Sequence, residues 1–335
     1  MQLICGEARN VLKTFPDNYF QAVVTSPPYW LLRNYQQSGQ LGLEKSPDEY
    51  VDQLMLIMQE VKRTLRNDGI LWLNIGDTYG GRNEDNGAIR AHGTRKKDLV
   101  GIPWMVAFAM KKDGWILRND IIVSKTNPMP DGAKDRPSRS HEYFFMFTKQ
   151  ENYYYDYYSS LEDSENPIET LQRFGARHQE GTYRHDQNRV FEHYGKRNKR
   201  SVWSTSVGSC GDYHYAVFPE KLIDPCIATS ISQKGACIKC GKPIERILEK
   251  QKIPANNNKG YDLKLITTGW EKKCDCDTTE TKRCIVLDPF SGTGMTGKIC
   301  SKYDVDYVGI DINPNYIEMS KNIFLKNKDM FTEIL

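Results

Sequence analysis

A strand, a glycine turn, a helix and a second strand follow one another near the C-terminus, and this order constrains the fold most. The apolar run Ile285–Leu287 leads into the turn Asp288-Pro289-Phe290-Ser291-Gly292-Thr293-Gly294. Such glycines let the backbone approach a ligand, and a helix expected from Gly294 to Ser301 presents free N–H groups. About twenty residues on, the strand Tyr307–Ile310 ends in Asp311, where an acid can accept hydrogen bonds from ribose hydroxyls. A tight turn alone would explain the glycines, but Asp311 in this context favours a nucleoside-cofactor site.

The rest of the chain predicts alternating strands and helices, which is typical of a parallel-rich sheet covered by helices. Short apolar runs predict buried strands, and the apolar periodicity predicts helices. The expected strands are Leu3–Cys5, Ala22–Thr25, Ile70–Ile75, Trp115–Ser124, Tyr143–Thr148 and Cys284–Leu287. The expected helices are Pro47–Leu65, Leu99–Lys111, Phe218–Ala228 and Pro314–Lys326. Ser46 is the expected cap of the Pro47 helix, and Asn67-Asp68-Gly69 is expected to end it.

The second chemical motif, Ser26-Pro27-Pro28-Tyr29, directly follows the expected strand Ala22–Thr25. Prolines hold the chain extended and donate no backbone hydrogen bond. We therefore expect the carbonyls of Ser26 and of both prolines to be free to accept from an outside amino group. Tyr29 offers a flat face for stacking on a base, and Ser26 a hydroxyl. The alternative is a turn that ends a strand and carries an aromatic plug.

Length and composition narrow the class of protein. A chain of 335 residues predicts one large α/β domain with insertions, and a net charge of +3 excludes no partner. The N-terminus does not resemble a signal peptide, and no apolar run approaches the roughly 20 residues of a membrane helix. Nine cysteines without secretory features indicate a reducing cytoplasm, with metal ligands or free thiols rather than disulfides. We therefore expect a cytoplasmic enzyme without a membrane association.

With the Ser26–Tyr29 motif placed before the Asp288–Gly294 motif, the chain resembles the DNA amino-methyltransferases of the permuted beta arrangement. The resemblance implies a circularly permuted, Rossmann-like methyltransferase fold with helices on both faces of the sheet. It also implies S-adenosyl-L-methionine as cofactor, double-stranded DNA as substrate, and a restriction–modification or phage context with a cognate endonuclease. Ser-Pro-Pro-Tyr is the form used mostly for cytosine N4, whereas adenine-N6 members more often carry Asp or Asn in place of Ser26. The implied catalytic residues are Ser26, Pro27, Pro28 and Tyr29. The implied cofactor-binding residues are Asp288, Pro289, Phe290, Gly292, Gly294, Thr296, Asp311, Phe218 and Pro219.

The expected reaction moves a methyl group onto an exocyclic amine, so the protein mainly has to position and polarise the reactants. Acceptors at Ser26 and the Pro27 carbonyl would bind the amino hydrogens of a flipped-out base. Three alternatives stay open: an adenine-N6 enzyme, an RNA or protein methyltransferase, and a DNA-binding module without activity. The sequence also leaves open whether the protein is a monomer or a homodimer.

Composition divides the chain into five expected parts. These are a catalytic half (1–150), a target-recognition region (151–205), a cofactor-enclosing segment (206–231), a Cys-rich insert (232–283) and a cofactor-binding half (284–335). The target-recognition region opens with Tyr153–Tyr158, for which we expect a strand that joins the core. Between Leu171 and Trp203 it carries eight basic residues and three acids, a balance that suits phosphate contacts. The candidate DNA-binding residues are Arg173, Arg177, Arg184, Arg189, Lys196, Arg197, Lys199 and Arg200.

The Cys-rich insert contains Cys237-Ile238-Lys239-Cys240 and Cys274-Asp275-Cys276. The first pair, followed by Gly241, has the spacing of a zinc knuckle. Four thiolates, Cys237, Cys240, Cys274 and Cys276, could close a tetrahedral structural site. The second pair is Cys-x-Cys rather than Cys-x-x-Cys, so free cysteines and redox chemistry remain alternatives to zinc.

Overall fold

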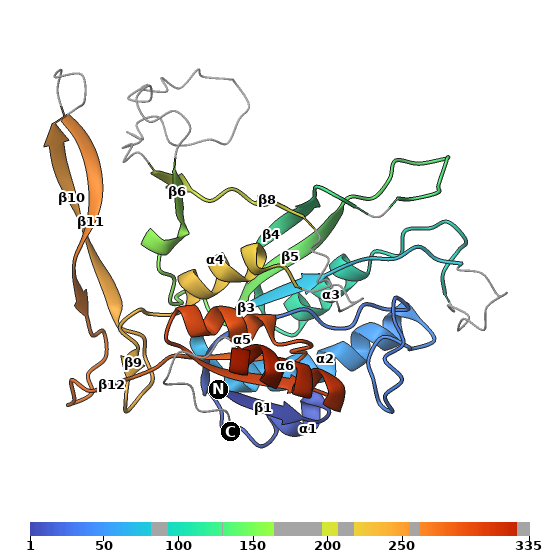
Figure 1. The fold of residues 1–335 in the computed structure, drawn as a ribbon, viewed down its shortest axis with the longest axis horizontal. Helices are drawn as coiled ribbons and strands as arrows, with labels where there is room; N and C mark the ends of the chain where they lie inside the picture. The colour runs from blue at the N-terminus through green and yellow to red at the C-terminus, as the bar shows by residue number, and fades with distance from the viewer. Residues whose placement is uncertain (82–92, 129, 164–195, 207–217, 255–260, 327–335) are drawn as a thin grey trace.

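The computed structural model describes residues 1–81, 93–128, 130–163, 196–206, 218–254 and 261–326, and a mixed sheet forms its centre (Figure 1). Within these residues the strand order is β1-β14-β13-β2-β3-β5-β4-β8. Strand β5 runs antiparallel to both of its neighbours, and the other neighbouring pairs are parallel. The strands are Gln2–Cys5 (β1), Phe20–Thr25 (β2), Leu65–Ile75 (β3), Ile116–Lys125 (β4), His141–Thr148 (β5), Val202–Thr205 (β8), Ile285–Asp288 (β13) and Asp306–Asp311 (β14). The predicted α/β class with a parallel-rich sheet is confirmed.

Helices cover both faces of this sheet, because successive strand residues point to opposite sides. Val23 and Leu71 pack in one core with α1, α2 and α3, while their neighbours Val24 and Trp72 pack in a second core with α4, α5 and α6. Each cluster consists mainly of buried apolar side chains, and this alternation fixes the register of the buried strands. The helices are Ala8–Leu12 (α1), Pro47–Thr64 (α2), Ile102–Lys112 (α3), Glu220–Ser230 (α4), Met295–Lys302 (α5) and Pro314–Lys326 (α6).

Helix α2 begins as expected and ends earlier than expected. The Ser46 hydroxyl accepts from the backbone N–H of Glu49 at 3.2 Å, and Pro47 occupies the first turn. The helix stops at Thr64, and β3 starts at the next residue. The expected turn at Asn67-Asp68-Gly69 is therefore wrong, since these residues lie inside β3 at an irregular step of its pairing with β2. A Cβ on Gly69 would lie 2.8 Å from the Gln21 carbonyl, so glycine serves a close approach of two strands here.

The tyrosine-rich segment also differs from the prediction, because Tyr153–Tyr157 is not a strand and Tyr158–Ser160 forms a 3₁₀ turn (η2). Its backbone amides form single hydrogen bonds that do not belong to a β-ladder. The Tyr154 amide donates to the Asp68 carbonyl at 2.9 Å, and the Asp156 amide donates to the Thr229 carbonyl at 2.8 Å. The segment still packs on the core, as expected, through irregular backbone.

In the described residues, three antiparallel strand pairs lie outside the main sheet. They are Leu161–Asp163 (β6) with Lys196–Asn198 (β7), Ala236–Cys237 (β9) with Thr281–Lys282 (β12), and Glu245–Pro254 (β10) with Tyr261–Glu271 (β11). The β10–β11 hairpin extends from the body of the molecule as a long arm, with β9 and β12 at its base (Figure 1). In the described part of the chain, no helix combines the length and apolarity needed to cross a membrane.

Candidate active site

The two chemical motifs meet at one cavity of about 520 Å³. The loop Ser26–Tyr29 follows β2, the turn Asp288–Gly294 follows β13, and these strands are neighbours in the sheet. From this point β14 and β1 extend to one side and β3 to the other, so the cavity lies at a switch point of the sheet order. Ligands of open α/β sheets bind at the carboxyl ends of strands at such a point.

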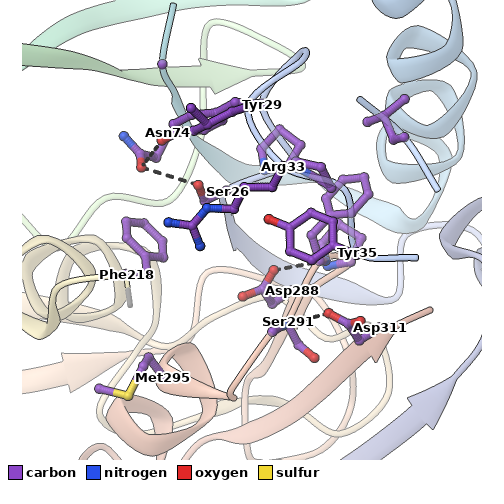
Figure 2. Close-up of a pocket in the computed structure, with 18 of the residues that line it drawn as sticks. Ser26, Tyr29, Arg33, Tyr35, Asn74, Phe218, Asp288, Ser291, Met295 and Asp311 are labelled. Atoms are coloured by element: carbon purple, nitrogen blue, oxygen red, sulfur yellow. Dashed lines mark hydrogen bonds between the residues drawn. The ribbon is translucent and has the colours of Figure 1, made fainter. Parts of the chain in front are cut away.

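Ser26 is oriented by Asn74, a side chain of β3. The Ser26 hydroxyl donates to Asn74 Oδ1 at 3.3 Å, and Asn74 Nδ2 donates to the Tyr143 carbonyl at 3.0 Å (Figure 2). Because a carbonyl oxygen of an amide can only accept, the Ser26 proton is directed to Asn74. The lone pairs of the Ser26 oxygen remain for a donor that enters the cavity.

Neighbouring residues fix both the hydroxyl group and the ring of Tyr29. Its hydroxyl lies 2.9 Å from Asn74 Oδ1 and 3.0 Å from Glu142 Oε2, and its single proton serves these two acceptors. Burial, reinforced by the Glu142 carboxylate, raises the pKa of Tyr29, so the side chain is a neutral phenol. The ring packs on the backbone of Gly76, where an added Cβ would lie 2.5 Å from Tyr29 Cε2.

The carbonyls of the motif are not equivalent, which corrects the sequence-based expectation. Tyr50 of α2 donates its hydroxyl proton to the Pro28 carbonyl at 2.9 Å, so this carbonyl already has a partner. Among the described residues, the Ser26 and Pro27 carbonyls accept no hydrogen bond. Two backbone acceptors rather than three are thus available beside the Ser26 hydroxyl.

Asp288 joins the cofactor turn to the strand that carries the catalytic loop. Its carboxylate accepts from the Thr25 and Thr296 hydroxyls, each at 2.7 Å, and from the Phe290 amide at 3.1 Å. Burial raises the pKa of Asp288 to about 6, although the two threonine hydroxyls act in the opposite direction. Asp288 and Thr296, both predicted to bind cofactor, line the cavity. Their side chains are hydrogen-bonded to each other, and Asp288 is also bonded to Thr25.

Asp311 lies at the end of β14, opposite Tyr35 in the close-up view (Figure 2). Its carboxylate accepts from the amides of Gly292 and Asn313, each at 2.8 Å, and burial raises the pKa of Asp311. Two amides use only part of the four acceptor positions of a carboxylate. The remaining positions can accept a ligand's hydroxyl groups.

Most of the other predicted cofactor residues line the same cavity, whereas Gly294 lies beside it at the start of α5. Gly292 and Gly294 have φ of +51° and +80°, and a Cβ on Gly294 would lie 2.8 Å from Ser320 Oγ. Gly294 is the N-cap of α5, so the first amides of that helix face the turn. Phe218 packs edge-on to Phe144 with ring centroids 5.7 Å apart, and Pro219 precedes α4. Both line the cavity with Pro289 and Phe290, so the structure brings the predicted catalytic and cofactor residues together.

Among the residues that line this cavity, the sequence did not identify Asn74, Glu142, Lys125 and Arg33 as site residues. Asn74 had a detectable signal, because a buried amide in the apolar strand Ile70–Ile75 needs a partner. Glu142 forms an ion pair with Lys125, and this pair depends on the antiparallel pairing of β4 with β5. Figure 2 shows Arg33 directed into the cavity beside Ser26 and Phe218. Nothing in the sequence around Arg33 indicated this position.

Half of the eight predicted DNA-binding residues lie in the part of the chain that the structure describes. Arg173, Arg177, Arg184 and Arg189 lie outside the described residues. Lys196 pairs with Asp163 at 3.1 Å, and Arg197 and Lys199 pair with Glu162 at 3.0 and 3.7 Å. Arg200 is exposed next to β8. Acids of β6 therefore offset part of the positive charge that the sequence concentrates here.

Comparisons with known proteins give a consistent result. The model of a DNA methylase family (N6_N4_Mtase) matches residues 20–239 and 277–322 and leaves out 240–276, which include the hairpin arm. The type II methyltransferase M.Cfr9I of Citrobacter freundii is 34% identical, over 95% of this chain and 85% of its own length. The type II methyltransferase M.SmaI of Serratia marcescens is 33% identical, over 98% of this chain and 91% of its own length.

Solved structures share the fold. The cytosine-N4-specific PvuII DNA methyltransferase aligns over 99% of this chain and 87% of its own, with a TM-score of 0.59 and 16% identity. A putative DNA modification methylase of Thermus thermophilus, solved with S-adenosyl-L-methionine, aligns over 100% of this chain and 99% of its own, with a TM-score of 0.55 and 21% identity. At these identities the likeness concerns the fold, which agrees with the predicted methyltransferase sheet.

Proposed function

The chain belongs to the family of N6 and N4 DNA methylases, and within it we propose that this protein methylates the exocyclic N4 amine of cytosine in double-stranded DNA. Membership makes it a DNA methyltransferase. The observation that carries the methyl-transfer proposal is that Ser26 and Asp311 line one cavity. Serine at the head of the catalytic motif favours cytosine N4 over adenine N6.

We propose S-adenosyl-L-methionine as the methyl donor; when bound, it supplies an electrophilic methyl group on a sulfonium. Asp311 would accept the ribose hydroxyls, and the Gly292–Gly294 turn would let the cofactor approach the backbone. Phe218 and Pro219 would enclose the other end of the cavity. The Thermus protein of the same fold, solved with this cofactor, supports the choice.

Ser26 and Pro27 would act on the target amine. The amine of a flipped-out base would donate one hydrogen to the Ser26 oxygen and the other to the Pro27 carbonyl. This directs the nitrogen lone pair away from the loop and toward the cofactor turn. Methylation would leave one proton in excess on the nitrogen, and this proton would pass to solvent water, because a serine hydroxyl and a backbone carbonyl are too weakly basic to keep it. Asn74 accepts the Ser26 proton, so that this proton does not point at the incoming amine. Tyr29 would place a neutral aromatic ring beside the base.

The chain order supports the permuted beta arrangement, because the catalytic strand β2 precedes the cofactor strand β13 although they are neighbours. The type II relatives favour a restriction–modification role with a cognate endonuclease. Arg200 and the basic residues around it would contact DNA phosphates, so the affinity for DNA should fall as salt rises.

The direct test is incubation of the full chain with S-adenosyl-L-methionine and mixed-sequence DNA, followed by nucleoside mass spectrometry. We expect N4-methylcytosine, formed about 100-fold more slowly in a matched Ser26→Ala reaction. N6-methyladenine as the product would overturn the choice of cytosine and keep the family reaction.

A further inference from the structure

Four thiols of the insert converge on one point. Cys237 and Cys240 lie in and after β9, while Cys274 and Cys276 lie between β11 and β12. All four sulfur atoms lie within 4.8 Å of one another, and all are free thiols. A tetrahedral Zn²⁺ with bonds of about 2.3 Å sets its sulfur ligands about 3.8 Å apart. A small contraction of the cluster therefore produces a closed tetrahedral site.

The backbone of the first pair is shaped for this role. Gly241 has φ of +70° and donates to the Cys237 carbonyl at 2.8 Å, while the Cys237 amide donates to the Lys242 carbonyl at 2.9 Å. These two backbone hydrogen bonds fix the turn that joins Cys237 to Cys240, as partners outside the ligand shell do in metal sites.

Two lysines, Lys242 and Lys272, bind the backbone beside the cluster, where positive charge favours an anionic filled site. Four thiolates around Zn²⁺ carry a net charge of −2. Lys272 donates to the Cys276 and Thr278 carbonyls, and Lys242 donates to the Lys273 carbonyl at 2.9 Å. These two ammonium groups close the loops that carry the second pair of cysteines.

The cluster lies far from the candidate active site. Gln21, at the start of β2, donates to the Gly241 carbonyl at 3.2 Å, and Arg66, at the start of β3, donates to the Cys240 carbonyl. The catalytic loop follows the opposite, carboxyl end of β2, and none of the four cysteines lines its cavity. A site with four protein ligands leaves no open position for chemistry, so its role is structural.

We propose that Cys237, Cys240, Cys274 and Cys276 bind one structural Zn²⁺, which fastens the base of the β10–β11 arm to the amino ends of β2 and β3. The insert has few buried apolar side chains of its own around the knuckle, namely Ala236 and Ile244. A metal supplies the stability that so small a core lacks. The proposal does not depend on the methyl-transfer reaction.

The test measures metal rather than activity. We expect full-length protein, purified without added metal, to contain about one zinc per chain by elemental analysis. Cobalt exchanged for zinc should give the thiolate charge-transfer bands of a tetrahedral site. Cys276→Ser should lose most of the metal, whereas Cys5→Ser, an exposed cysteine outside the insert, should retain it.

A second measurement keeps the proposal testable if the Cys276→Ser variant does not fold. Zinc released from the folded wild type by a thiol-modifying reagent is followed with a colorimetric chelator, and release should parallel the loss of four thiols. Iron with sulfide in place of zinc, or metal-free protein that binds neither zinc nor cobalt, would overturn the proposal.

Discussion

The Ser26 hydroxyl points its proton at Asn74 Oδ1, 3.3 Å away, and this relationship leaves the oxygen of Ser26 as an acceptor. A serine with a free rotor could offer either its proton or its lone pairs to an incoming amine. Because the Tyr143 carbonyl fixes Asn74, the Ser26 proton stays on Asn74 Oδ1 and only the lone pairs of the Ser26 oxygen are available to an amine donor. The catalytic loop is therefore prepared for a donor before any substrate arrives.

Ser26→Ala should lower kcat by about 100-fold, since single preorganised hydrogen bonds at reacting groups contribute on that order. Cofactor affinity should stay unchanged, because Ser26 is assigned to the base and not to the ribose. The measurement combines single-turnover methylation with calorimetry of cofactor binding. Ser301→Ala, an exposed serine of α5, is the matched control. Equal turnover in both variants would remove Ser26 from the mechanism.

Gly76→Ala should reduce methylation because its Cβ would lie 2.5 Å from Tyr29 Cε2 and displace the ring. A displaced Tyr29 loses its hydrogen bonds to Asn74 and Glu142, so kcat should fall more than KM rises. Gly132→Ala is the control, since a Cβ there meets nothing within 4 Å. Comparable kinetics for the two alanine variants would show that the position of Tyr29 does not matter.

Asp311→Asn should raise the Kd for S-adenosyl-L-methionine by roughly 10-fold, a loss of about 1.4 kcal/mol. The amide keeps the size of the side chain but has fewer acceptor positions for ribose hydroxyls beside the Gly292 and Asn313 amides. Asp304→Asn, at the surface near β14, controls for the lost charge. Calorimetry decides: an unaltered Kd in the Asp311 variant contradicts the ribose assignment.

Stability should depend on pH through Asp288, whose pKa burial raises to about 6. Because this pKa exceeds that of the unfolded chain, the folded state holds the extra proton between about pH 4 and 6. The contribution of Asp288 to stability is therefore largest below this range and falls as pH rises through it, by roughly 2–3 kcal/mol at most.

The measurement is urea unfolding of wild type and Asp288→Asn at several pH values, since other titrating groups cancel in the difference. Relative to the variant, the wild type should lose stability from about pH 4 to 6 and then stay constant. A flat difference across this range would mean that Asp288 stays ionised in the fold.

Asp156→Ala should destabilise the protein by about 3–5 kcal/mol, the usual cost of removing one partner of a buried ion pair. Asp156 accepts from Arg246 at 2.8 Å, and the Arg246 and Asp156 side chains are 9% and 1% exposed. Arg246 also lies over the Trp270 ring at 4.4 Å, so the pair holds the arm to the tyrosine segment. Thermal or chemical unfolding tests this, and Asp277→Ala, which breaks the exposed pair with Lys239, should change little.

Local patterns in the sequence were enough to predict the fold class and the two halves of the candidate site. Short apolar strands, the glycine turn and the acid at position 311 are local signals, because backbone geometry and period depend on neighbouring residues. The same local chemistry predicted the four cysteines as a group. It misjudged Asn67-Asp68-Gly69 and Tyr153–Tyr158, where pairing with distant backbone outweighed turn and strand propensity.

Which groups face the cavity, and which already have a partner, followed from the tertiary structure alone. Tyr50 donates a hydrogen bond to the Pro28 carbonyl, and Thr25 and Thr296 donate to the Asp288 carboxylate. Each of these partners is distant in sequence or belongs to another element, so no local pattern predicts the bond. The partners of Ser26 and Tyr29 come from β3 and β5, whose order in the sheet no local pattern encodes. Hydrogen bonds of this kind are set by strand order and packing, so they emerge only when the chain is folded.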